Sequence, residues 1–169
     1  MVDELKKRIL SSILLVPLLF FFILKGSIYF NFLLFIIVLI TIYEWHFLSF
    51  KKIYYLPGLI FIFFSFYSFY FLRNEGNFAF FILILLTCIF TDIGGYTFGK
   101  IFKGPKLTKI SPDKTYSGVI GGFLLSTIFS ILYIKNIHNF NLYFNNRDLD
   151  LQLLIIILFI SLISQIGDL

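Results

Sequence analysis

The sequence TDIGGYTFGKIFKGPKLTKISPDKT, from Thr91 to Thr115, begins inside an apolar run and leaves it through a loop rich in glycine and lysine. Asp92 stands near the end of that run, where an ionisable side chain at membrane depth is costly and points to function. The loop then reaches Ser-Pro-Asp-Lys-Thr. An acid on a helix beside a basic, glycine-containing loop predicts a site for a metal ion and an anionic phosphate substrate.

The composition of the whole chain places this stretch in a membrane. Hydrophobic residues make up 59% of the 169 residues and charged residues only 14%, whereas a soluble domain carries roughly a quarter charged residues. One core of this size cannot bury so much apolar surface, so a bilayer must cover it. The apolar runs are continuous rather than alternating, which predicts helices and not strands.

We therefore expect an all-α, polytopic integral membrane protein with about six transmembrane helices, each of roughly 20 apolar residues. The expected spans are Ile9–Leu24, Ser27–Phe47, Tyr54–Leu72, Phe78–Phe98, Gly118–Ile134 and Leu151–Leu169. We treat residues 1–169 as a single membrane domain, with an N-terminal helix pair over residues 1–50 and the region that carries the candidate site over residues 51–169.

Lysine and arginine are distributed unevenly between the loops on the two sides of these spans. Ten lie on one side, namely Lys6, Lys7, Arg8, Lys51, Lys52, Lys100, Lys103, Lys106, Lys109 and Lys114. The other side has four, namely Lys25, Arg73, Lys135 and Arg147. Because cytoplasmic loops carry the excess of basic residues, we predict that the N-terminus and the Lys100–Lys114 loop are cytoplasmic. The net charge of +5 then indicates anionic lipid headgroups rather than nucleic acid as the partner.

The end of the basic loop carries the candidate phosphate site. Pro112 fixes a turn, so that the hydroxyls of Ser111 and Thr115 and the ammonium of Lys114 can converge and hold phosphate oxygens. The alternative interpretation is that the lysines only set the topology, and for any single lysine other than Lys114 that alternative is favoured.

A second acid stands at the end of the last expected span. The chain ends Ser-Gln-Ile-Gly-Asp-Leu, which puts Asp168 at the same membrane face as Asp92. Two carboxylates at one face can bind Mg2+ through their oxygens. The alternative is that Asp168 is a solvated residue near the chain end, and the spacing alone does not decide between the two.

Together these motifs resemble those of the bacterial phosphatidate cytidylyltransferases, also called CDP-diacylglycerol synthases. The matching positions are Asp92, Tyr96, Gly99, Lys100, Ile110-Ser111-Pro112, Lys114-Thr115, Gly118 and Gly121-Gly122. Gly167-Asp168-Leu169 is similar to the start of that family's C-terminal signature, and the N-terminal pattern is similar too. The chain departs from the family pattern at Asp113 and Ser117, and the later family elements lie beyond Leu169. On this resemblance we expect the front part of a longer protein, inactive by itself.

The resemblance implies an enzyme of the bacterial inner (plasma) membrane that transfers the cytidylyl group of CTP to phosphatidate and releases pyrophosphate, in phospholipid biosynthesis. It implies Mg2+ as cofactor, CTP, phosphatidate and membrane lipids as partners, and it allows a homodimer. The site residues that it implies are Lys114 and Asp92 as catalytic groups, Lys100, Ser111, Thr115 and Tyr96 as substrate contacts, and Asp168 as a metal ligand. Two alternatives stay open: a CTP-dependent lipid kinase, and a multispan transporter of anionic solutes.

Overall fold

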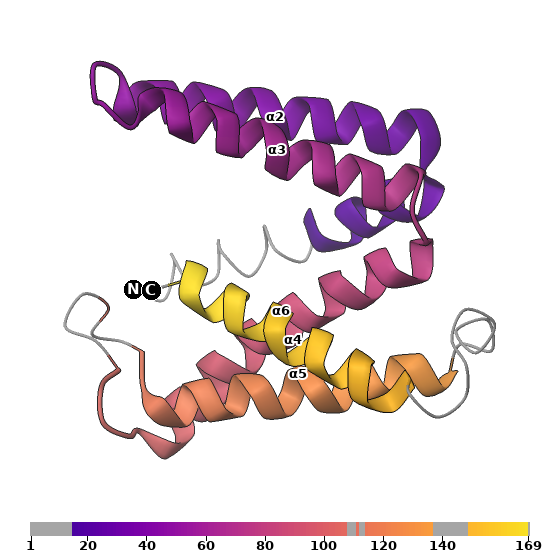
Figure 1. Ribbon diagram of the computed structural model, residues 1–169, viewed down its shortest axis with the longest axis vertical. Helices are drawn as coiled ribbons and strands as arrows, with labels where there is room; N and C mark the ends of the chain where they lie inside the picture. Colours follow the sequence, from indigo (N-terminus) through magenta and orange to yellow (C-terminus); the bar gives the residue numbers. More distant parts are fainter. Residues whose placement is uncertain (1–14, 108–110, 112–113, 137–148, 169) are drawn as a thin grey trace. The chain divides into compact units, whose positions relative to one another are not determined.

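The computed structural model describes residues 15–107, 111, 114–136 and 149–168 (Figure 1). These residues form a first helix, Leu15–Lys25, followed by α2 (Ser27–Ser49), α3 (Tyr55–Asn74), α4 (Phe78–Phe102), α5 (Tyr116–Asn136) and α6 (Leu149–Gly167). Within the described ranges no strand is present beyond one isolated antiparallel bridge, Lys106 to Thr115. The predicted all-α class is confirmed.

Four of the helices, α2 to α5, are long and apolar enough to cross a membrane, which confirms a polytopic membrane protein. The first helix and the apolar part of α6, Leu151–Gly167, are shorter. The expected first span, Ile9–Leu24, begins outside the described residues. The α4 helix runs four residues beyond the expected end at Phe98, because Gly99-Lys100-Ile101-Phe102 continues the helical turn instead of opening the loop.

The chain divides into two compact units, the N-terminal unit Met1–Phe78 and the C-terminal unit Ala79–Leu169. The expectation of a single membrane domain with a boundary near residue 50 stays a prediction. In the N-terminal unit α2 and α3 lie side by side (Figure 1). At the turn between them, the Trp45 indole donates a hydrogen bond to the Tyr55 carbonyl at 3.1 Å. The same ring lies against Gly58, where a Cβ would come within 2.0 Å of a ring carbon.

In the C-terminal unit, glycines let α4 and α5 approach at backbone distance. A Cβ on Gly94 would lie 2.4 Å from the Gly121 carbonyl oxygen, and a Cβ on Gly118 would lie 2.7 Å from the Gly95 carbonyl oxygen. Small residues serve this purpose in membrane bundles, where lipid tails are as apolar as leucine and close packing must hold the helices together.

Hydrogen bonds between side-chain hydroxyls join α4, α5 and α6. The Thr87 and Ser130 hydroxyls lie 2.9 Å apart, and the Ser161 hydroxyl accepts hydrogen bonds from Thr91 at 2.9 Å and from Ser126 at 3.2 Å. All five residues are buried. Since no water reaches such groups in a bilayer, each hydroxyl must find its partner within the protein. The network therefore fixes the register of α6 against α4 and α5.

Candidate functional site

A cavity of about 550 Å³ opens in the C-terminal unit where α4, the returning loop, the start of α5 and the end of α6 meet. We call it the polar cavity. Its lining residues are Thr91, Asp92, Gly95, Tyr96, Gly99, Lys100, Leu107, Lys114, Thr115, Gly118, Val119, Gln165 and Asp168. Six of the seven predicted site residues are in this set, and Ser111 is not. The structure thus brings together acids and lysines that are far apart in the sequence.

The helical repeat of α4 places three of these side chains on one wall. Asp92, Tyr96 and Lys100 are spaced by four residues, so they lie above one another on one face. The Lys100 ammonium lies 3.2 Å from the Tyr96 hydroxyl and 5.4 Å from the centre of its ring. Lys100 was expected to open the loop, and this was wrong, because Lys100 stands in the last turn of α4.

Backbone hydrogen bonds fold the loop after α4 back on itself. The Leu107 amide donates to the Lys114 carbonyl at 2.8 Å, and the Tyr116 amide donates to the Pro105 carbonyl at 3.1 Å. The Lys114 amide in turn donates to the Ser111 carbonyl at 3.2 Å. Ser111 therefore shapes the turn that presents Lys114, whereas its predicted contact with phosphate stays a prediction.

Thr115 caps the first turn of α5. Its hydroxyl accepts a hydrogen bond from the Gly118 amide at 3.2 Å and lies 3.0 Å from the Ser117 hydroxyl. Threonine is a preferred residue at this position because its oxygen satisfies an amide that has no partner inside the helix. The cap holds the loop end beside the polar cavity, a structural task that the sequence analysis did not foresee.

An ion pair joins the loop to α6 across the cavity. The Lys114 ammonium pairs with the Asp168 carboxylate, although the two residues stand 54 positions apart. The side chains are 39% and 55% exposed, and exposed pairs of this kind contribute only about 0–1 kcal/mol. A phosphate could therefore replace Asp168 as the partner of Lys114, and a cation could replace Lys114 as the partner of Asp168.

Gln165 is a lining residue that the sequence analysis missed. Its side-chain amide donates to the Val119 carbonyl at 3.4 Å and lies 3.5 Å from the Ser161 hydroxyl. It thus links the buried hydroxyl network to the cavity, one helical turn before Asp168. The available signal was a polar side chain inside the apolar run Leu151–Gly167.

The donor set of the polar cavity suits a cation that is shared with a phosphate. Asp92 and Asp168 both line the cavity, together with Lys114. Among the described residues no group of three or more histidine, cysteine or acidic side chains is present. Mg2+ is commonly held by one or two carboxylates together with substrate phosphates and water, so two carboxylates are a sufficient protein contribution.

Comparison with known proteins gives consistent matches. A model of the cytidylyltransferase family matches residues 53–169. A phosphatidate cytidylyltransferase of Rickettsia felis is 36% identical over 168 residues, which cover 96% of this chain and 72% of that protein. That of Rickettsia bellii is 35% identical over 176 residues, covering 99% and 73%. That of Staphylococcus aureus is 36% identical over 107 residues, covering 62% and 38%. No solved structure gives a significant match.

Proposed function

Because the chain belongs to the cytidylyltransferase family, we propose that it transfers the cytidylyl group of CTP to phosphatidate, giving CDP-diacylglycerol and pyrophosphate. The observation that carries this proposal is the polar cavity, which gathers Lys100 and Lys114 with Asp92 and Asp168. A site of this kind can hold two polyanions, one dissolved in water and one anchored in the bilayer.

The chemistry needs no base from the protein. A phosphate monoester such as that of phosphatidate has a second pKa of about 6 and is largely dianionic at neutral pH. One of its oxygens forms a bond to the α-phosphorus of CTP. The bond from that phosphorus to the oxygen bridging to the β-phosphate breaks, and the electron pair leaves with pyrophosphate. Catalysis then rests on positioning and charge neutralisation.

The lining residues and the neighbouring Ser111 divide this work between them. Lys114 and Lys100 come from two different elements, and their charges oppose the repulsion between the two substrates. Tyr96 orients the Lys100 ammonium, and Thr115 and Ser111 hold the turn that presents Lys114. Asp92 and Asp168 would hold a divalent cation, which we propose is Mg2+. When bound, Mg2+ would supply positive charge to the phosphates of CTP.

The membrane setting completes the proposal. We place the protein in the inner (plasma) membrane with the N-terminus and the polar cavity at the cytoplasmic face, where CTP is available, in contact with membrane lipids and open to homodimer formation. Single cysteines at Lys103 and Glu75, in a Cys88→Ser background, test this orientation. An impermeant thiol reagent should label Glu75→Cys and not Lys103→Cys in intact cells, and the reverse pattern would contradict the placement.

The test of the reaction is product analysis with the full-length protein. Membranes that contain it should convert CTP labelled at the α-phosphate and phosphatidate into labelled CDP-diacylglycerol. A CTP-dependent lipid kinase would instead phosphorylate a lipid and release CDP, and a transporter would give no product. The names of the relatives favour neither alternative, and either result would overturn the proposal.

A further inference from the structure

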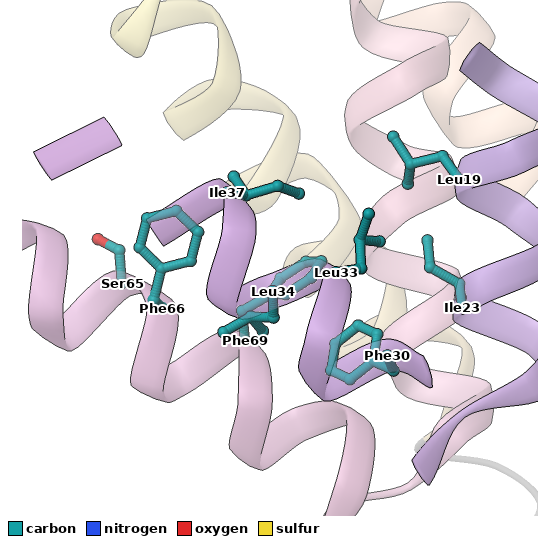
Figure 2. Close-up of a pocket in the computed structure, with 9 residues that line it drawn as sticks. All are labelled: Leu19, Ile23, Phe30, Leu33, Leu34, Ile37, Ser65, Phe66 and Phe69. Carbon is teal, nitrogen blue, oxygen red and sulfur yellow. The ribbon is translucent and has the colours of Figure 1, made fainter. Parts of the chain in front are cut away.

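The N-terminal unit contains a second cavity, of about 360 Å³, with no counterpart of the charged groups that line the polar cavity. Figure 2 shows side chains from the first helix, α2 and α3 around it. They are Leu19, Ile23, Phe30, Leu33, Leu34, Ile37, Ser65, Phe66 and Phe69. We call it the apolar cavity. Ligand pockets in proteins typically measure roughly 300–1,000 Å³, so the space is large enough for a molecule rather than a packing defect.

A guanidinium group lies against two of the residues that line the apolar cavity. Arg73 donates hydrogen bonds to the Ile23 carbonyl from Nε at 3.0 Å and from Nη2 at 2.9 Å. Its guanidinium carbon lies 5.7 Å from the centre of the Phe30 ring. Ile23 and Phe30 both line the cavity. The charge is therefore held in place beside the apolar wall, in the last turn of α3.

The glycine between the first helix and α2 makes room for the Arg73 guanidinium. Gly26 has φ of +64°, and a Cβ there would lie 2.1 Å from Nη2 of Arg73. The preceding residue is Lys25, an exposed cation whose ammonium lies 5.8 Å from the Phe21 ring centre. Lys25 thus adds a second positive charge next in sequence to the glycine that Arg73 contacts.

No acid compensates these charges in the part of the chain that the structure describes. The single ion pair found there joins Lys114 to Asp168 in the other unit. Glu75 follows Arg73 by two residues and is exposed, but forms no ion pair among the described residues. An anion from outside the chain is the natural complement of Arg73 and Lys25.

A bilayer supplies an anion that also fits the apolar cavity. Moving an acyl tail from the bilayer into the cavity gains no hydrophobic free energy, because both surroundings are equally apolar. The tail can fill the cavity, but only the headgroup charge can select the lipid. Helix ends lie at the depth of the headgroups, where each basic residue strengthens binding of an anionic lipid roughly fivefold.

We propose that the apolar cavity is a binding site for an anionic phospholipid, with one acyl tail among the residues of Figure 2 and the headgroup phosphate on Arg73 and Lys25. The site lies in a different compact unit from the polar cavity. It is independent of the proposed reaction and would stand if that reaction were disproved.

Native mass spectrometry of the full-length protein tests this proposal. The protein is released from nanodiscs of phosphatidylcholine that contain phosphatidylglycerol as a minor component. The bound lipid should be enriched in phosphatidylglycerol relative to the disc. Arg73→Gln and Lys25→Gln should each reduce that enrichment about fivefold. Lys52→Gln, at the opposite end of the α2–α3 pair, is the matched control and should leave it unchanged.

Two further arms separate the lipid from other occupants. Leu34→Trp fills the cavity and keeps both cations, so it should abolish retention of the lipid. In the parent protein, glycerol phosphate should not compete with the lipid, because it has no acyl tail. Lys25→Gln and Leu34→Trp leave the Arg73 hydrogen bonds intact, so they decide the matter if Arg73→Gln fails to fold. Equal retention of both lipids, full competition by glycerol phosphate, or a cavity occupied by a second copy of the chain would overturn the proposal.

Discussion

The two units of this protein are built from similarly apolar helices, yet one surrounds an apolar cavity and the other a polar one. The N-terminal unit holds its helices together with large side chains, such as Trp45 over Gly58. The C-terminal unit uses backbone contact at Gly94 and Gly121 and buried hydroxyls such as Ser161. Close backbone approach and satisfied polar groups let α4, α5 and α6 pack beside the charged side chains of the polar cavity, so the site depends on the small residues.

The largest expected effect contrasts one lysine from each unit. Lys114→Ala should reduce turnover by about a hundredfold or more, the usual cost of removing a group that stabilises transition-state charge. Lys51→Ala, on the turn of the N-terminal unit, should leave turnover almost unchanged. Initial rates of CDP-diacylglycerol formation by the full-length variants measure both. Equal, mild losses would show that the lysines only set the topology.

The next effect contrasts glycines with different neighbours. Gly94→Ala puts a Cβ 2.4 Å from a backbone oxygen, which cannot move without shifting α5, and should cost about 1–3 kcal/mol of stability. In Gly58→Ala the new Cβ would contact the edge of the Trp45 ring that carries Nε1. That ring can turn away at the loss of one hydrogen bond, which should cost about 0.5–1.5 kcal/mol of stability.

Gly95→Ala is the control for the helix itself. Its Cβ would meet nothing closer than 3.9 Å, so it should be neutral or slightly stabilising. Thermal unfolding in detergent gives the order of the three variants. A Gly58→Ala variant less stable than Gly94→Ala would break the distinction between side-chain and backbone packing.

A smaller effect separates the hydroxyls of the two units. Ser161→Ala removes the acceptor of Thr91 and Ser126 and should cost about 0.6 to 1.7 kcal/mol, the average and the maximum measured for interhelical hydrogen bonds in membranes. Ser65 donates only to the Phe61 carbonyl of its own helix, so Ser65→Ala should have little effect. Denaturation in mixed micelles compares them, and equal stabilities would remove the hydroxyl network from the account.

The sequence could predict local features of the site, but not contacts between residues that are far apart along the chain. Asp92 was predicted from its place in an apolar run, whereas Tyr96 and Lys100 were named only because they match the family pattern. The expected span ended at Phe98, four residues before the end of α4, because glycine and lysine there are typical of a loop. The pairing of Lys114 with Asp168 spans 54 positions and depends on how α6 crosses α5, which no local pattern encodes.

The glycines show the same limit. Gly118 and Gly121 were named only as positions that match the family pattern, and their close approach to α4 is known only from the structure. The apolar cavity had no sequence signal, since its lining side chains are the same types that face lipid elsewhere. Arg73 was read only as a basic residue of a loop, whereas its hydrogen bonds to Ile23 depend on the break at Gly26.

We propose that the cytidylyl group is transferred in the polar cavity, with Asp168 holding the cation. The most direct measurement is the yield of CDP-diacylglycerol and pyrophosphate from CTP and phosphatidate with Mg2+, for the full-length protein and for Asp168→Asn and Glu75→Gln. We predict that the parent and Glu75→Gln each form CDP-diacylglycerol and pyrophosphate in equal amounts and with the same yield. Asp168→Asn should form almost none of either product. Undiminished synthesis by Asp168→Asn would contradict the account.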